Sequence, residues 1–362
     1  MSSDGFLSID CGLDDKDSGY KDPTTGILYV SDGQYVDTGE NHRISVEEEE
    51  GSRRRYTTVR SFPSGVRNCY TLPTVAGAKY LVRLMSVYGN YDGKNSSATL
   101  QFDLYLGVNY WDTVHADNEN LHEALFIAWA SWTPVCLFNI GRGTPFVSFV
   151  ELRTLGSQLY LDLTANESMS LAMRGNMGSN ISITRYPTDA YDRWWSGQSG
   201  PTWKNLSTVT PVEIEEYLFN VPSAVMETAV ETVSNKTVLD AISWLDKASP
   251  HEYKNSQLRQ FNVSLNKYNG FQYSPPYLES SPLGSSNWDK SDNGLYTVKL
   301  VPTAASVLPP MLNAYELYTR IPHVNPKTLA SDCKHSLPIL LDRYYSVFLW
   351  LEIYLANCGH TQ

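Results

Sequence analysis

The side chains best suited to bind a ligand lie in two loops that combine aromatic rings with polar groups. A flat ring can pack against the C–H face of a sugar, while amide and carboxylate groups bind its hydroxyls. Because each loop follows an expected strand, one shared site requires the two strands to run in the same direction. The predicted ligand-binding residues are Tyr88, Asn90, Tyr91, Asp92, Tyr110 and Trp111.

Turn formation is a second explanation for the same loops. Asn, Asp and Gly favour turns, and a tyrosine beside them can cap a hydrophobic core. Adjacent antiparallel strands would put the two loops at opposite ends, so the 88–92 loop alone is the better candidate for a ligand surface.

No motif of a catalytic or metal site is present. The 7 histidines form no H-E-x-x-H or H-x-x-H pair, and the 5 cysteines form no C-x-x-C pair. The chain also lacks a G-x-S-x-G nucleophile motif and a phosphate-binding loop. We therefore predict no catalytic residue, no metal and no cofactor. A glycoside-active enzyme stays open as a hypothesis, because the two carboxyl groups of such an enzyme are recognised only by their separation in space.

The composition describes an acidic, foldable chain. Its 362 residues include 28 Lys and Arg against 39 Asp and Glu, which gives a net charge of −11. Phosphate backbones require a basic surface, so no nucleic-acid partner is expected. A hydrophobic share of 42% is enough for packed cores and excludes global disorder.

Six Asn-x-Ser/Thr sequons favour the secretory pathway, since ordinary composition would give roughly one or two. The alternative is accidental accumulation in a chain rich in Ser and Asn. The predicted glycosylation sites are Asn95, Asn166, Asn180, Asn205, Asn235 and Asn262.

Neither end of the chain carries a recognisable membrane signal. Residues 1–5 lack the basic and apolar regions of a signal peptide. The apolar stretch 337–356 contains Asp342, Arg343 and Glu352, whose charges argue against a membrane-spanning helix.

Strand patterns dominate the chain. Residues 101–109 alternate, which puts apolar side chains on a core and Gln101, Asp103 and Asn109 in water. A similar apolar stripe runs through 80–88. Short strands, turn clusters and aromatic residues predict an all-β fold of β-sandwiches with few short helices.

An internal repeat predicts two copies of one β module. Residues 101–106 recur as 260–265, and 145–152 recur as 310–317, with similar offsets of 159 and 165 residues. Coincidental similarity of strand-like segments is the alternative. The predicted organisation is a first module over 6–185, a second over 186–322 and a divergent tail over 323–362.

Ordered motifs along the chain resemble one known family. They are Phe6-Leu-Ser-Ile-Asp-Cys-Gly12, Tyr29-Val-Ser-Asp32, Val59-Arg-Ser-Phe-Pro63, Arg67-Asn-Cys-Tyr70, Tyr88-Gly-Asn-Tyr-Asp-Gly93, Phe102-Asp-Leu-Tyr-Leu-Gly-Val-Asn109, Gly141-Arg-Gly-Thr-Pro145, Tyr191-Asp-Arg193 and Leu308-Pro-Pro310. They are similar to the malectin-like ectodomains of plant leucine-rich-repeat receptor-like kinases, over about 6–321.

The resemblance implies tandem malectin-like β-sandwiches in a glycoprotein outside the cell, at the plasma membrane. It implies a non-catalytic ligand-binding region for carbohydrate or peptide sensing in signalling. The implied partners are a cell-wall or microbial carbohydrate or a signalling peptide, together with a co-receptor. The alternatives are a secreted, kinase-less lectin or decoy and a non-functional truncated gene product.

The chain departs from the family pattern in its second module and its tail. Between Trp244 and Arg259 an expected strand is missing, and after Ile321 the pattern dissolves. With no kinase motif and no signal peptide, the chain looks like a truncated receptor. Cys11, Cys69 and Cys136 fall in the well-matched first module, so any disulfide should lie among them. No defined role is expected for Cys333 and Cys358 in the tail.

Overall fold

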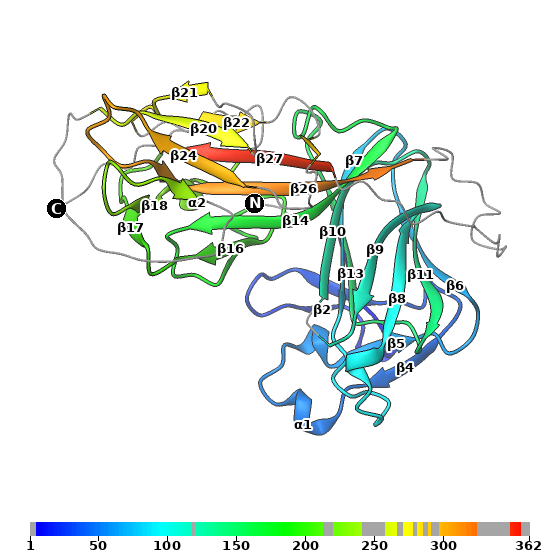
Figure 1. The fold of residues 1–362 in the computed structure, drawn as a ribbon. Helices are drawn as coiled ribbons and strands as arrows, with labels where there is room; N and C mark the ends of the chain where they lie inside the picture. The colour runs from blue at the N-terminus through cyan, green and yellow to red at the C-terminus, as the bar shows by residue number, and fades with distance from the viewer. Residues whose placement is uncertain are drawn as a thin grey trace. The chain divides into compact units, whose positions relative to one another are not determined.

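The computed structural model describes residues 5–117, 120–212, 220–240, 258–265, 271–277, 281–284, 289–290, 297–323 and 348–355. Within these residues strands predominate (Figure 1), and the two α-helices, α1 (Val46–Glu49) and α2 (Ser223–Met226), have four residues each. Three 3₁₀ turns complete the helical elements: η1 (Asp15–Asp17), η2 (Arg54–Tyr56) and η3 (Ser97–Thr99). The predicted all-β class is confirmed.

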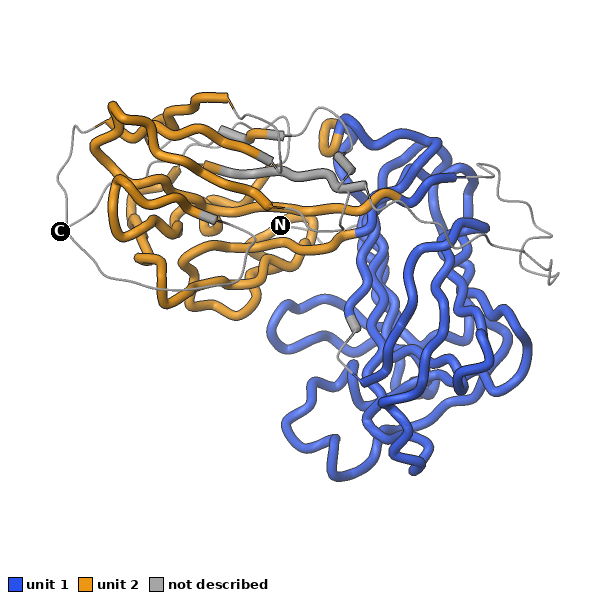
Figure 2. The backbone as a smooth tube through the Cα atoms, in the orientation of Figure 1, with its two compact units in different colours: residues 1–157, 161–170, 321–343 blue, residues 158–160, 171–320, 344–362 orange. Residues whose placement is uncertain are grey.

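The chain forms two compact units (Figure 2). Unit 1 contains residues 1–157, 161–170 and 321–343, and unit 2 contains 158–160, 171–320 and 344–362. The boundary predicted from the sequence lies between residues 185 and 186, and the predicted module boundaries remain a prediction. The observed division falls inside strand β14 (Glu167–Met177), whose Ser170 pairs with Ala124 and whose Gly175 pairs with Ser196. A continuous strand carries no turn signal, so the sequence gives no sign of this division.

The described residues of unit 1 form three sheets. The largest has the order β2 (Tyr20–Lys21), β3 (Leu28–Ser31), β1 (Phe6–Asp10), β13 (Phe149–Thr154), β7 (Lys79–Ser86) and β10 (Asn120–Ile127), followed by the start of β14. The second has the order β6 (Arg67–Pro73), β11 (Trp132–Arg142), β8 (Gln101–Leu106) and β9 (Asn109–His115). The third has the order β12 (Phe146–Val147), β5 (Thr58–Ser61) and β4 (Glu40–Arg43).

The core of unit 1 lies between the two larger sheets. Tyr80, Val82 and Leu84 of β7 belong to the same buried cluster as alternate apolar residues of β8, so the sheets form a sandwich. This confirms the prediction that the apolar stripes of 80–88 and 101–109 face a core. The prediction that Asp103 and Asn109 face water is wrong, because they are 7% and 4% exposed. Asp103 accepts a hydrogen bond from the Thr113 hydroxyl, which satisfies a carboxylate on a face that other residues cover.

Unit 2 repeats these three sheets. The first has the order β14, β26 (Ala314–Pro322), β27 (Phe348–Leu355) and β22 (Ser281–Gly284), with β15 (Ile183–Thr184), β16 (Trp195–Gln198) and β23 (Asp289–Lys290) attached. The second has the order β19 (Leu239–Asp240), β24 (Val298–Pro302), β20 (Phe261–Leu265) and β21 (Phe271–Tyr273). The third has the order β17 (Trp203–Ser207), β18 (Thr228–Thr232) and β25 (Met311–Leu312).

The two units share one strand order. The sheet β6-β11-β8-β9 matches β19-β24-β20-β21, and β12-β5-β4 matches β25-β18-β17. The repeated sequences 101–106 and 260–265 supply β8 and β20, and Phe261 and Val263 are buried as Phe102 and Leu104 are. The tandem arrangement predicted from the sequence repeat is therefore confirmed.

Two other predictions concern the segment between β19 and β20 and the tail. The missing strand between Trp244 and Arg259 falls mostly in 241–257, outside the described residues. Within the predicted tail, residues 348–355 form β27, a strand of unit 2. Neither helix among the described residues has the length and apolar character needed to cross a membrane.

Candidate functional site

The predicted 88–92 loop follows β7 and leads through η3 into β8. Tyr88 is 8% exposed and belongs to the core cluster of unit 1. Its hydroxyl donates to the Asp92 carboxylate and lies 3.2 Å from the Ser96 hydroxyl. Burial raises the pKa of Asp92, but hydrogen bonds from Tyr88 and Lys94 outweigh it and leave that pKa below its usual 3.8. These bonds hold the loop in a turn.

Tyr91 packs its ring against the core rather than standing free. Its ring centroid lies 5.2 Å from that of Phe146, 5.5 Å from that of Tyr88 and 5.3 Å from that of His42. Its hydroxyl is buried, with no hydrogen-bond partner among the described residues. The Asn90 side chain accepts a bond from the Asn95 amide at 3.0 Å. These contacts favour the capping explanation for the rings, and the ligand-binding role of the loop remains a prediction.

Tyr110 and Trp111 lie at the other end of β8. They belong to β9, directly after the turn that ends β8, whereas the 88–92 loop leads into the start of β8. Trp111 is 5% exposed, and its indole donates to the Ser170 hydroxyl at 3.0 Å. Tyr110 is half-buried, and its hydroxyl lies 2.8 Å from that of Thr113. The structure therefore does not bring these two residues together with the loop.

The sequons are placed on the surface of their units. Four of the sequon asparagines are exposed, namely Asn95, Asn166, Asn180 and Asn205. The other two, Asn235 and Asn262, are half-buried. None of the six is fully buried, so the fold leaves room for a glycan at the four exposed positions.

A cleft of about 500 Å³ lies elsewhere in unit 1, and the sequence did not predict it. One wall is the segment 33–38, which follows β3, and the other is the start of β6, with the first residue of β11. The Thr71 amide donates to the Tyr35 carbonyl at 2.8 Å and ties the two walls together. The polar and aromatic lining residues are Gln34, Tyr35, Asp37, Thr38, Arg67, Asn68, Thr71 and Trp132.

The cleft offers rings and planar polar groups at the same time. Tyr35 and Trp132 are half-buried, while Gln34 and Asp37 are exposed. Burial raises the pKa of Tyr35, so its hydroxyl stays protonated at neutral pH and can donate or accept a hydrogen bond. This combination of rings with an amide, a carboxylate and a hydroxyl suits a polyhydroxylated ligand.

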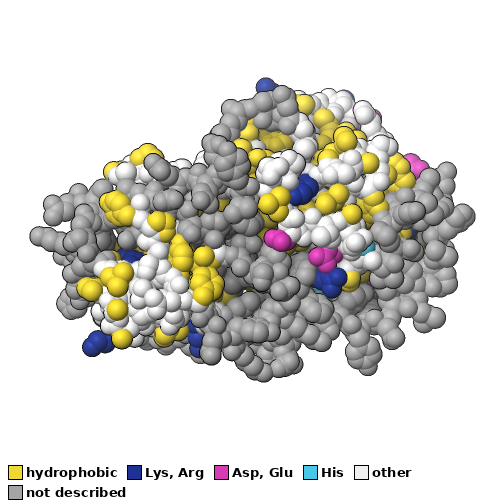
Figure 3. Space-filling model, turned by 90° about the horizontal axis from the view of Figure 1, so that it is seen from above, with side chains coloured by type: hydrophobic (Ala, Val, Ile, Leu, Met, Phe, Trp, Pro, Cys, Tyr) yellow, Lys and Arg dark blue, Asp and Glu magenta, His cyan; other side chains and the backbone are white. Residues whose placement is uncertain are grey.

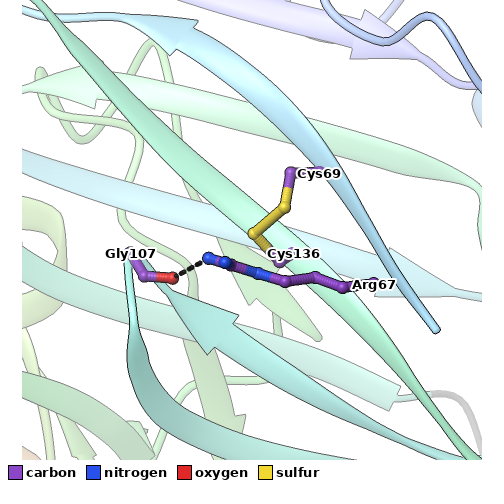
Figure 4. The surroundings of a disulfide bond; sticks show 4 residues. All are labelled: Arg67, Cys69, Gly107 and Cys136. Carbon is purple, nitrogen blue, oxygen red and sulfur yellow. Dashed lines mark hydrogen bonds between the residues drawn. A yellow bond between two sulfur atoms is a disulfide. The ribbon is translucent and has the colours of Figure 1, made fainter. Parts of the chain in front are cut away.

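A disulfide supports the β6 wall of the cleft (Figure 4). Cys69 of β6 is bonded to Cys136 of β11, its direct neighbour in the sheet, with Cα atoms 4.0 Å apart. The Arg67 guanidinium extends past this disulfide and donates to the Gly107 carbonyl at 2.8 Å. Cys11 is buried and forms no disulfide. The prediction that a disulfide lies among the first three cysteines is confirmed, whereas Cys333 and Cys358 lie outside the described residues.

Asp32 anchors the segment that forms the other wall. Its buried carboxylate accepts two bonds from Arg60, at 2.6 and 2.7 Å, and one from the Tyr70 hydroxyl at 2.9 Å. The motifs 29–32 and 67–70, which stood out in the sequence, therefore border the cleft. Their separation along the chain hid the relation, because only the pairing of distant strands brings them together.

No metal site accompanies the cleft in the described part of the chain. Its His, Cys, Asp and Glu residues form no group of three or more that could hold a metal ion. On the face shown in Figure 3, the described charged side chains are scattered among hydrophobic and uncharged ones. The lining itself offers rings and hydrogen-bonding side chains.

Comparison with known proteins agrees with the architecture. A family model described as the malectin-like domain matches residues 9–320. The probable LRR receptor-like serine/threonine-protein kinases At1g51810 and At1g05700 of Arabidopsis thaliana are each 35% identical over 87% of this chain. The chain spans only 37% and 38% of their respective lengths.

Solved structures with the same fold include the ANX2 ectodomain from Arabidopsis thaliana. It has a TM-score of 0.67 at 13% identity, with 88% of this chain and 97% of that chain covered. A structure of the plant peptide RALF23 in complex with FER and LLG2 has a TM-score of 0.64 at 13% identity, covering 99% and 97%. At this identity the two structures support the fold alone.

Proposed function

The chain belongs to the malectin-like family, and from this membership we propose that it is the extracellular, non-catalytic ligand-binding region of a plant receptor-like kinase. The observation that carries the proposal is the family match over 9–320, joined to 35% identity with receptor-like kinases. On this proposal the chain senses a signal, and any kinase activity belongs to a part of the protein outside the malectin-like units.

Two features of unit 1 and unit 2 support a location outside the cell, at the plasma membrane. The Cys69–Cys136 disulfide suits an oxidising compartment. Exposed sequons such as Asn95 and Asn205 are accessible for glycosylation in the secretory pathway.

We assign the ligand to the cleft between 33–38 and β6, and a carbohydrate fits its chemistry best. Tyr35 and Trp132 supply rings, and Asp37 and Gln34 supply planar groups for hydroxyls. The 88–92 loop is a second proposed surface, with its rings already packed against other side chains. A signalling peptide with a co-receptor is the other proposed ligand, because a protein of the same fold has been solved with the peptide RALF23 and LLG2.

Binding of the full chain to a panel of cell-wall oligosaccharides and signalling peptides tests this proposal. Trp132→Ala should weaken binding of a carbohydrate hit at least tenfold, because the cleft loses a ring. Trp129→Ala is the matched control, since Trp129 is also a half-buried tryptophan of unit 1 but does not line the cleft. Equal effects of the two variants would exclude the cleft, and an absence of any hit would contradict the sensing role.

Location is tested by expressing the full-length gene in plant cells. Treatment of the purified product with an N-glycosidase should increase its mobility, and external protease should remove the chain from intact cells. Recovery of the chain from the medium alone would favour the secreted alternative, and an unglycosylated intracellular chain would contradict both.

A further inference from the structure

The repeat leaves one strand position of unit 2 to be filled. In unit 1, β7 lies between β13 and β10 and runs antiparallel to both. Along the chain β7 comes between β6 and β8. Its counterpart in unit 2 should therefore come between β19 and β20, where the structure describes only residues 258–260.

That position is occupied by a strand from the other end of the chain. β27 lies between β26 and β22 and runs antiparallel to both (Figure 1). In the sheet order, β3-β1-β13-β7-β10 of unit 1 corresponds to β16-β14-β26-β27-β22 of unit 2. The first pair is parallel in each unit, as β1 with β3 and β14 with β16. β27 thus has the neighbours and the direction of β7, but not its place in the sequence.

The pairing register agrees residue by residue. β7 pairs with Phe149–Thr154 of β13, and β27 pairs with Ala314–Thr319 of β26. The offset of 165 residues that aligns the two sequence copies converts the first six positions into the second six. In the strand register, Glu151 lies opposite Arg83 in unit 1, and its counterpart Glu316 lies opposite Glu352 in unit 2.

An empty position here would be costly. Ala314–Tyr318 is buried throughout, so backbone N–H and C=O groups of β26 would be left unpaired away from water. Leu355 is fully buried in the core cluster of unit 2, together with Leu317 and Phe261. The strand therefore adds both ladder hydrogen bonds and apolar burial.

We propose that β27 is a replacement strand, so that the position between β26 and β22 is a binding site for an extended apolar segment. Residues 348–355 of this chain occupy it. Recognition rests mainly on main-chain hydrogen bonds, as when a peptide is added to a sheet. The inference is independent of the receptor role proposed above.

Cross-linking in the full chain tests the position and the register. Thr319 and Leu349 are direct partners, so the pair Thr319→Cys and Leu349→Cys should form a disulfide on mild oxidation. The control pair Thr319→Cys and Leu351→Cys is two residues out of register and should give at least tenfold less cross-link by mass spectrometry. Equal yields, or no cross-link in the first pair, would overturn the proposal.

Hydrogen exchange tests whether β27 supplies the ladder. Leu351→Pro removes an N–H from the strand and should accelerate amide exchange of 314–319 at least tenfold. Leu351→Ala keeps the N–H and serves as the matched variant, and β7 in unit 1 should stay protected in both. Unchanged protection of 314–319 in the proline variant would overturn the proposal. If that variant also loses protection in β7, the chain has unfolded, and the cross-linking result decides.

A synthetic peptide of residues 348–355 tests the site itself. Added to the full-length Leu351→Pro chain, it should restore slow exchange of 314–319, because it can enter the position left by the weakened strand. The same peptide carrying the proline is the control. Failure of the unmodified peptide to restore protection in a chain whose unit 1 remains folded would overturn the binding-site claim.

Discussion

Gly12 and Gly178 occupy the same place in the two halves of the repeat. Each follows the strand that begins its unit, β1 or β14, and each has φ +77. A Cβ added to Gly12 would lie 2.1 Å from the Val59 carbonyl oxygen, and one added to Gly178 would lie 2.1 Å from that of Ala229. The duplication therefore preserves a single close approach between two backbone segments.

Alanine at either glycine should destabilise its unit strongly. Gly12→Ala adds a steric overlap with fixed backbone to the strain of a positive φ, so we expect a loss of more than about 3 kcal/mol. Gly77→Ala is the control, because Gly77 has φ +83 but no atom within 4 Å of an added Cβ. It should cost only about 1–2 kcal/mol. Denaturant unfolding measures both, and equal losses would contradict the role of the close approach.

The buried carboxyl of Asp10 should make the free energy of unfolding depend on pH. The residue at the matching position of unit 2, Asn176, indicates a substitution that removes this dependence. Burial raises the pKa of Asp10 to about 6, although hydrogen bonds from Thr58 and Tyr20 act in the opposite direction. A carboxyl whose pKa is raised on folding stabilises the protein fully below about pH 4, and this contribution is lost as the pH rises to about 6. The difference corresponds to about 3 kcal/mol.

The matching position in unit 2 is Asn176, whose side-chain oxygen accepts a bond from Thr228 at 2.8 Å, as Asp10 accepts one from Thr58 at 2.6 Å. Asp10→Asn should therefore abolish the fall in stability between pH 4 and pH 6, relative to the wild type. Unfolding free energies measured across this range would contradict the prediction if the two curves stay parallel.

Arg83 should be essential to the stability of unit 1. Its fully buried guanidinium donates to Glu123 at 2.7 and 3.0 Å and pairs with Glu151. Arg83→Ala leaves two buried carboxylates without this partner and should cost about 3–5 kcal/mol. Lys94→Ala removes the pair between an exposed lysine and the half-buried Asp92 and should cost less than about 1 kcal/mol. Similar losses for the two variants in thermal unfolding would contradict the assignment.

The Cys69–Cys136 disulfide should contribute to stability through the length of chain that it closes. The two cysteines are 67 residues apart, so replacing both by alanine should cost about 2–4 kcal/mol. The loss should equal that of the wild-type chain unfolded under reducing conditions. A double variant as stable as the oxidised wild type would contradict the prediction.

Tyr91→Ala should mainly lower stability, whereas Trp132→Ala should mainly lower carbohydrate affinity. Tyr91 packs against Phe146 and Tyr88, so its removal should lower stability by about 2–4 kcal/mol. Trp132 lines the cleft, so its removal should reduce carbohydrate affinity at least tenfold, which is about 1.4 kcal/mol or more, and change the melting temperature little. Loss of binding in Tyr91→Ala with unchanged stability would return the ligand site to the 88–92 loop.

Local pattern was enough to predict much of the fold. Alternation in 80–88 and 101–109 identified the strands β7 and β8, because a period of two is a property of consecutive residues. The repeat of 101–106 and 145–152 predicted two copies of one module, since each copy must bury the same faces. The sequence also predicted that any disulfide would lie among Cys11, Cys69 and Cys136, and the bond joins two of them.

Tertiary structure decided the relations between distant segments. Asp103 is buried because other residues cover a face that alternation assigned to water. The cleft exists because segment 33–38 is tied to β6, and β27 reaches unit 2 from beyond the repeat. Strand pairing and face-to-face packing depend on which segments meet in space. A sequence pattern records the faces of a strand, but not the neighbour that each face or edge receives.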